Sequence, residues 1–217
     1  WTSAPVPPRM ALRLPGASGE WVTVHAPSYT GVTELQVEWV GSLDAYTSLF
    51  SLFRHGTTTA QQRSWGLFII GSAIGFGCYQ GTASPESLAN ASVASVLPAA
   101  GQLFAVRGVW RANNGSGTPD TRLFTSTDEG VAWTLRATAA TAPSSTLFQP
   151  TDTVVDLGAA NSGNAGTIAG RIVRASIRLN GNLYAEYDGR TAAGPRYYDI
   201  ANKTWTINGT AWGWTRA

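Results

Sequence analysis

Charge, cysteine and lysine are all scarce in this sequence of 217 residues, and each shortage narrows what the protein can be. Only 13% of the residues are charged, which is about half the share in an average globular domain. The formal net charge of +2 excludes a nucleic-acid binder that works by strong electrostatic attraction. The single cysteine, Cys78, excludes an intramolecular disulfide framework and a cysteine-rich zinc site.

Long apolar runs are missing as well, and we expect no membrane insertion. No stretch reaches the roughly 18 uninterrupted apolar residues that a transmembrane helix requires. Of the 15 basic residues, one is lysine (Lys203) and the others are arginine, a bias that GC-rich coding explains. Aromatic residues are plentiful, with 9 Trp, 7 Tyr and 7 Phe. They supply enough apolar surface for the core of one domain of this length.

Alternation of apolar and polar residues with a period of two recurs along the chain, and it predicts β-strands. In the clearest run, Thr33 to Val40, the side chains of Leu35, Val37 and Trp39 face one way. Other runs include Met10 to Leu14, Ser64 to Ile70, Ile74 to Gln80, Ser92 to Leu97, Leu103 to Trp110 and Gly170 to Leu179. Gly and Asn-Gly turns separate the runs. Only Pro85 to Asn90 favours a helix, of at most one turn.

The fold class predicted from this pattern is all-β: a two-sheet antiparallel jelly-roll sandwich. We expect it to fill residues 10–217 as a single domain. The Pro-rich start, with Pro5-Val6-Pro7-Pro8, predicts an extended arm over residues 1–9.

An ordered series of segments carries a resemblance to a known family. The segments are Arg13-Leu14-Pro15-Gly16, Gln61 to Leu67, Val106 to Trp110, Ile168 to Arg174 and Lys203 to Gly209. In this order they resemble a laminin-G-like or concanavalin-A-like jelly-roll domain. The segment Lys203 to Gly209 resembles the closing strand of one subgroup of this family. That subgroup is found in virion proteins of phages that infect actinobacteria, often as minor tail proteins.

The resemblance implies a structural or adhesion module of the virion, without enzymatic activity. Its expected partners are other virion proteins, further copies of the same chain as a homo-oligomer in the particle, and host cell-surface glycans. Three alternatives stay open: a capsid decoration protein of the same fold, a glycan-active enzyme of the jelly-roll glucanase type, and a secreted lectin.

Two carboxylates are the candidate catalytic groups for the alternative of a glucanase-type enzyme. Glu34 and Glu38 lie on one face of a strand, where successive side chains of the same face are about 6.6–7 Å apart, and the run resembles the Glu-x-Asp-x-Glu strand of a glucanase family. Here the central acid is replaced by Gln36. An ion-pair interpretation fits better. In the fold that the chain resembles, the strand Gly170 to Leu179 lies near this one, which implies contact of Glu34 or Glu38 with Arg174 or Arg178.

The segment Ser126 to Trp133 matches the Ser-x-Asp-x-Gly-x-x-Trp pattern of the Asp box in sialidase propellers. Propellers repeat this box, whereas the present chain holds one copy. We therefore interpret Asp128, Gly130 and Trp133 as a structural turn: the carboxylate accepts backbone N–H groups, the glycine takes a positive φ, and the indole packs across the hairpin.

Aromatic side chains are the candidates for ligand and partner contacts. Trp65 and Tyr79 lie in two runs that can pair as a hairpin, and a sugar could stack on either ring. Trp212 and Trp214, near the end of the sequence, could pack on a neighbouring subunit.

No catalytic residue, metal ligand or cofactor is predicted. His25 and His55 have no partner at metal-ligand spacing, and Cys78 in its apolar strand is interpreted as a buried structural residue. Calcium binding, which some laminin-G-like domains show, stays open, but the scattered aspartates name no ligand set.

Overall fold

The computed structural model describes residues 10–46, 50–56, 63–80, 85–141, 143–160, 163, 165–189, 196–210 and 212–216. The arm predicted over residues 1–9 lies outside these ranges. Within them the chain forms sixteen β-strands and one helical turn, α1 (Val93–Val96). No helix in the described part of the chain is long and apolar enough to cross a membrane.

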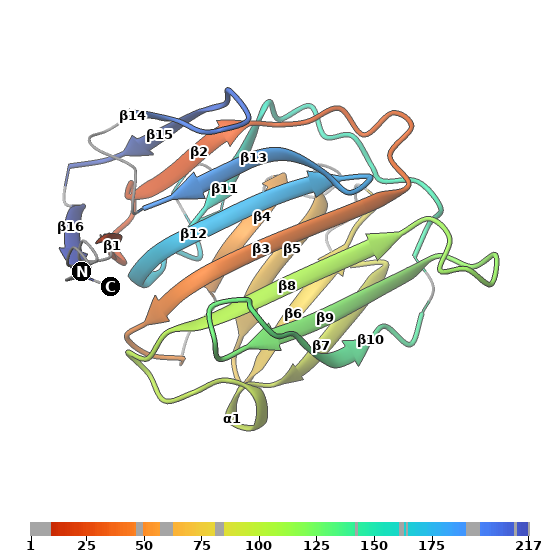
Figure 1. The fold of residues 1–217 in the computed structure, drawn as a ribbon, viewed down its shortest axis with the longest axis horizontal. Helices are drawn as coiled ribbons and strands as arrows, with labels where there is room; N and C mark the ends of the chain where they lie inside the picture. The colour runs from red at the N-terminus through yellow and green to blue at the C-terminus, as the bar shows by residue number, and fades with distance from the viewer. Residues whose placement is uncertain are drawn as a thin grey trace, which may run out of the picture.

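The strands form two antiparallel sheets that face each other (Figure 1). The first sheet has the order β10-β9-β8-β3-β12-β1-β16, and β13 also pairs with β12. Its strands are β1 (Met10–Pro15), β3 (Glu34–Leu43), β8 (Phe104–Arg111), β9 (Asp120–Ser126), β10 (Thr134–Thr138), β12 (Ala169–Leu179), β13 (Asn182–Asp188) and β16 (Gly213–Arg216). The long strand β12 is central, because it pairs with β3 on one side and with β1 and β13 on the other.

The second sheet has the order β14-β15-β2-β11-β4-β5-β6-β7. Its strands are β2 (Trp21–His25), β4 (Phe50–Gly56), β5 (Arg63–Ile70), β6 (Ala73–Cys78), β7 (Ser87–Ser92), β11 (Val154–Leu157), β14 (Arg196–Tyr198) and β15 (Thr204–Asn208). Strands β4 to β7 form a meander, seen behind the first sheet in Figure 1. The predicted all-β, two-sheet antiparallel sandwich is confirmed.

The core lies between the sheets and follows the period-two alternation of the sequence. Leu35, Val37 and Trp39 on β3 point inward and are fully buried, as the alternation predicts. The largest fully buried side chains include four indole rings, those of Trp39, Trp65, Trp110 and Trp205. The burial of these apolar side chains is the main force that holds the two sheets together.

One local prediction is wrong, because a strand and a helical turn exchange places. Pro85 to Asn90 was expected to hold the helical turn, but Ser87 to Ser92 form strand β7, paired with β6. Ser92 to Leu97 were expected to be a strand, but they contain the turn α1, closed by the bond from the Leu97 N–H to the Val93 carbonyl at 3.0 Å. A free edge on β6 pairs with whichever segment reaches it, so tertiary context overrides a weak local preference.

Candidate functional site

Three glycines lie at the centre of the outer face of strands β5 and β6. Gly66, Gly75 and Gly77 all lie on this face, and the ring of Phe68 covers them. A Cβ atom added at these three glycines would lie 3.4, 3.2 and 3.4 Å from carbon atoms of that ring. Phe68 therefore rests close to the backbone of the sheet, and at Gly75 a Cβ would be nearer to the ring than ordinary van der Waals contact allows.

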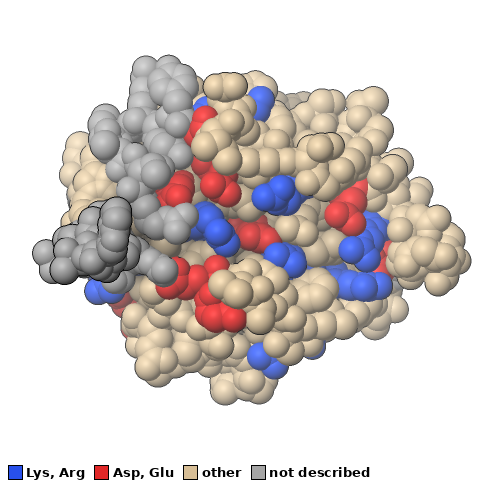
Figure 2. All heavy atoms as spheres, in the orientation of Figure 1, with Lys and Arg blue, Asp and Glu red and all other residues tan. Residues whose placement is uncertain are grey.

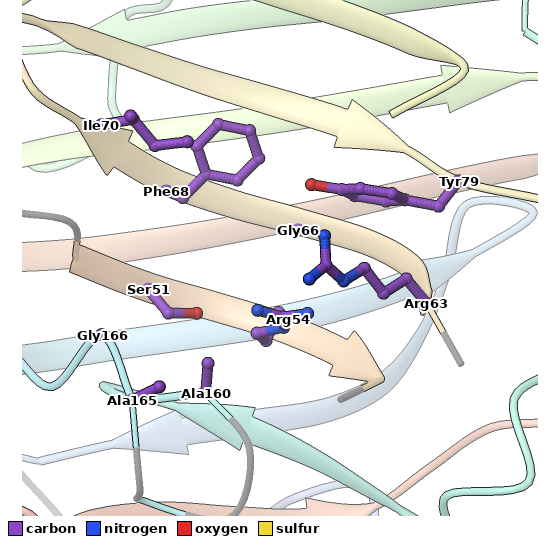
Figure 3. Close-up of a pocket in the computed structure, with 10 residues that line it drawn as sticks. All are labelled: Ser51, Arg54, Arg63, Gly66, Phe68, Ile70, Tyr79, Ala160, Ala165 and Gly166. Carbon is purple, nitrogen blue, oxygen red and sulfur yellow. The ribbon is translucent and has the colours of Figure 1, made fainter. Parts of the chain in front are cut away.

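A hollow opens beside this ring, with a volume of about 120 Å³ (Figure 3). Its lining comes from three parts of the chain that are distant in sequence: strand β4, the hairpin of β5 and β6, and the segment after β11. The lining residues are Ser51, Arg54, Arg63, Gly66, Phe68, Ile70, Tyr79, Ala160, Ala165 and Gly166. Ser51, Ala160, Ala165 and Gly166 lie on one side of it and the rings of Phe68 and Tyr79 on the other, with the guanidinium groups of Arg54 and Arg63 between them (Figure 3).

Tyr79 stands at the edge of the hollow, with 7% of its surface exposed. The guanidinium carbon of Arg63 lies 5.5 Å from the centre of the Tyr79 ring. Burial raises the pKa of Tyr79, so that its hydroxyl stays neutral and can both donate and accept hydrogen bonds. Burial also lowers the pKa of Arg54, and the nearby charge of Arg63 acts in the same direction.

Trp65, the other predicted sugar-binding residue, belongs to the core. Strands β5 and β6 pair as the hairpin that the sequence predicted, but Trp65 lies opposite Cys78 and points inward, whereas Tyr79 follows on the outer face. The Trp65 ring is fully buried and packs edge-on against Phe53 at 5.4 Å. It therefore has no free face on which a sugar could stack. The sequence could not separate the two residues, because alternation shows which side chains share a face but not which face is outside.

A chain of hydrogen bonds holds the side chains of Trp65, Tyr29 and His55 in place. The Trp65 indole N–H donates to the Tyr29 hydroxyl at 2.6 Å, and the hydroxyl contacts His55 Nδ1 at 2.7 Å. His55 Nε2 contacts the Asp152 carbonyl at 3.1 Å. A carbonyl only accepts, so Nε2 carries the proton and Nδ1 accepts from Tyr29. Burial lowers the pKa of His55, which favours this neutral form.

The two carboxylates weighed for catalysis lie on the other sheet and are engaged in ion pairs. Glu38 Oε1 is 2.6 Å from Arg107 Nη2, and Glu38 Oε2 is 3.7 Å from Arg174 Nη2. Glu34 Oε2 is 2.8 Å from Arg111 Nε. Figure 2 shows such basic and acidic side chains next to one another across the outer face of this sheet.

The predicted contact with β12 is thus confirmed by the pair of Glu38 and Arg174. The shorter bonds, however, come from Arg107 and Arg111 on β8, the strand on the opposite side of β3. The alternation of residues in the sequence did not indicate that β8 is a neighbour of β3. Paired in this way, the carboxylates are held by arginines and do not converge on an open cleft, so the geometry gives the glucanase alternative no support.

The segment Ser126 to Trp133 forms a tight turn between β9 and β10. Both carboxylate oxygens of Asp128 accept from the Ala132 N–H, at 2.9 and 3.1 Å, and Ser126 Oγ donates to Asp128 Oδ1. This last bond is the main reason that the pKa of Asp128 is lowered. Gly130 has a φ of 90°, and the Trp133 ring passes so close that a Cβ on this glycine would lie 2.8 Å from it.

Trp133 also ties the turn to the first sheet. The guanidinium carbon of Arg107 lies 4.0 Å from the centre of the Trp133 ring, and the same arginine binds Glu38. These contacts give Asp128, Gly130 and Trp133 a structural place in the fold.

Trp212 and Trp214 lie side by side at the edge of the first sheet. Their rings are 6.2 Å apart and nearly perpendicular, and both pack partly against the core. Trp214 on β16 is opposite Leu12 on β1. Their role at an interface between subunits stays a prediction.

The remaining reactive groups form no further site in the part of the chain that the structure describes. No group of three or more His, Cys, Asp or Glu side chains there could hold a metal ion. The Cys78 thiol is buried, and burial raises its pKa to about 12, so it is a weak nucleophile.

Comparison with known proteins extends the description of the fold. No family model and no curated protein matches the sequence. A Bacteroides ovatus protein that is named for carbohydrate binding matches 99% of this chain with a TM-score of 0.62 and 14% identity. Domains LG4-5 of the mouse laminin α1 chain match 86% with a TM-score of 0.53 and 12% identity. A SAP-like pentraxin of Limulus polyphemus matches 80% of this chain and 77% of its own, with a TM-score of 0.53 and 13% identity.

These similarities define the class of fold, a laminin-G-like and concanavalin-A-like jelly roll. The chain spans 61% of the Bacteroides ovatus protein and 48% of the laminin fragment. At 12 to 14% identity, the likeness establishes the fold and leaves the function to be argued from the site.

Proposed function

We propose that this chain is a glycan-binding module without enzymatic activity, and that the hollow on the outer face of β5 and β6 holds the sugar. One observation carries the proposal. The hollow combines an apolar floor, made by Phe68 resting on three glycines, with polar groups of Tyr79, Arg54 and Arg63 at its side.

This combination suits a sugar ring for two reasons. The C–H groups on one face of a pyranose are apolar and pack well against an aromatic ring, whereas its hydroxyl groups need hydrogen-bond partners at the rim. The Tyr79 hydroxyl can both donate and accept, and guanidinium groups donate. The similarity to the Bacteroides ovatus protein that is named for carbohydrate binding supports the same class of ligand.

The proposal is tested with a variant that fills the hollow without touching its polar groups. Ala165 lines the hollow, and its backbone exchanges hydrogen bonds with Ala160 at 2.7 and 3.1 Å. Ala165→Leu keeps both bonds and places a larger side chain at the wall. Leu135→Ala, an exposed change on β10 of the other sheet, is the matched control.

Both variants and the native chain are applied to an array of neutral and acidic glycans, and each ligand is then titrated by calorimetry or NMR. We expect the native chain and Leu135→Ala to bind the same glycans, and Ala165→Leu to lose at least about tenfold in affinity while its Tm stays within a few degrees. Glycan binding that Ala165→Leu leaves unchanged would overturn the location. An array without any ligand would overturn the function.

We further propose that the module is displayed on a phage particle as a minor tail or tail-tip protein, where it meets host-surface glycans. The support is the sequence resemblance to virion proteins. Immunogold labelling of particles with an antibody raised against the chain tests this placement. Gold at the tail is the expected result, gold over the head would favour the capsid decoration protein instead, and unlabelled particles would contradict a place in the virion.

A further inference from the structure

We infer that the glycan-binding site continues from the hollow across strands β5, β6 and β7, so that its ligand is an oligosaccharide and not a single sugar. The inference rests on the proposed function and adds to it the length of the ligand. The feature that points to it is an apolar surface on the outer face of the second sheet. This surface begins at the hollow with Phe68 and reaches Asn90 on the edge strand β7.

The apolar surface, here called the platform, consists of Phe68, Ile70 and Leu88. The Phe68 ring and the Leu88 side chain meet above Gly75, because a Cβ added to this glycine would lie 3.2 Å from Phe68 Cε2 and 3.1 Å from Leu88 Cδ1. Ile70 follows Phe68 on the same face of β5 and is 54% exposed. Figure 3 shows the side chains of Phe68 and Ile70 next to each other. The platform is therefore continuous, and solvent reaches it.

The strand register places the platform in one row with a polar group at each end. Ser51 on β4 is opposite Phe68 on β5, which is opposite Gly75 on β6. Gly75 in turn is opposite Asn90 on β7. Ser51 lines the hollow, whereas Asn90 is exposed. Neighbouring strands are about 4.8 Å apart, so the row from β4 to β7 spans roughly 14 Å. A single pyranose ring is shorter than this, and in the hollow it would leave Leu88 and Asn90 without contact.

The chemistry of the platform fits further sugar residues of the same ligand. The platform and Asn90 carry no charge, and the platform continues the apolar floor of the hollow without a break. The apolar faces of successive sugar rings can pack on Phe68 and Leu88, and the ring hydroxyls need partners at the edge. The Asn90 amide can both donate and accept hydrogen bonds. One oligosaccharide would therefore cover the hollow and the platform together.

Sugars of increasing length test the inference. We suggest mono-, di- and trisaccharides of glucose, galactose, mannose and N-acetylglucosamine, the longer ones in α and β linkage. Each is titrated against the native chain, Asn90→Ala and the control Asn182→Ala. Asn182 is an exposed asparagine of β13 on the other sheet. Ala165→Leu, the variant that fills the hollow, is titrated in parallel.

We expect at least one di- or trisaccharide to bind about tenfold or more tightly than its own monosaccharide. Asn90→Ala should weaken the binding of this longer sugar by about three- to tenfold, the loss expected for one hydrogen bond. The monosaccharide should not respond to Asn90→Ala, because it does not reach β7. Ala165→Leu should weaken both sugars, since both need the hollow, and Asn182→Ala should bind as the native chain does.

Equal affinity for monosaccharides and longer sugars, or an equal loss of both in Asn90→Ala, would overturn the inference and leave the proposed function intact. A second copy of the chain is the competing occupant of the platform, and sedimentation of the native chain and of Ile70→Ser tests it. A dimer that Ile70→Ser abolishes would also overturn the inference. Failure of every sugar to bind would instead contradict the proposed function. Circular dichroism and Tm of Asn90→Ala confirm that the variant is folded.

Discussion

Gly108 is the position at which the contact between the two sheets can be tested most directly. It lies on β8 of the first sheet, and a Cβ added there would lie 2.3 Å from two carbon atoms of the Phe76 ring on β6 of the second sheet. This is well inside the 3.4 Å at which ordinary van der Waals contact begins. Phe76 is fully buried, so its ring cannot swing out into solvent.

Gly108→Ala should therefore destabilise the protein by overpacking. Overpacked cores cost about 1–3 kcal/mol, and in a protein of this size each kcal/mol lowers Tm by about 2–4 °C. Urea denaturation followed by tryptophan fluorescence measures the loss. Because Phe76 is the obstacle, Phe76→Leu should make room, and the double variant should be more stable than the sum of the two single effects by about 0.5–3 kcal/mol.

A stability of Gly108→Ala within about 0.5 kcal/mol of the native chain, the range of neutral surface changes, would refute this account of the core. Strict additivity in the double variant would show that the cost does not come from the Phe76 ring. Gly19→Ala is not a suitable control, because its φ of 87° strains any side chain. Ala137→Gly, at a half-buried position on β10, reports the effect of an alanine–glycine exchange away from this contact.

Three further predictions concern buried polar groups. His55 is neutral in the fold, and burial lowers its pKa, so below about pH 6.5 the unfolded chain binds a proton that the folded chain does not bind. The free energy of unfolding should therefore decrease by up to about 1.4 kcal/mol for each pH unit below this point. The variant His55→Gln should lose this pH dependence. The Cys78 thiol, with a pKa of about 12, should react with a thiol reagent at pH 8 only after urea unfolds the chain. Glu38→Gln removes the charge that binds Arg107 and Arg174 and should cost about 1.5–3 kcal/mol in urea denaturation, less at 1 M NaCl; a loss that salt leaves unchanged would argue against the ion pairs.

Much of the fold could be predicted because period-two alternation is a local property of the sequence. On β3, the inward residues Leu35, Val37 and Trp39 and the outward Glu34 and Glu38 are where the pattern placed them. The exchange of strand and helical turn around Ser92 could not be predicted in this way. There the deciding factor was the free edge of β6, which pairs with β7 through the whole run from Ser87 to Ser92.

The candidate site could be predicted only in part. Tyr79 was selected from the sequence, and it stands beside the hollow. Arg54, Arg63 and Phe68 were missed. The sequence held a weak indication of this face. Glycines at alternate positions of a strand pair mark a face on which another group can rest close to the backbone.

The order of apolar and polar residues alone determined that this chain forms strands, which side chains share a face, and that the strands stack as two layers, because each strand must bury one row of side chains. Tertiary structure decided which row faces solvent at Trp65 and Tyr79, which strand supplies the arginines for Glu38, and where a hollow forms. The hollow brings Ala160, Ala165 and Gly166 beside lining residues of β4 and of the β5–β6 hairpin. Such a meeting depends on the pairing of β4 with β11, and strand pairing between distant segments leaves no trace in local periodicity.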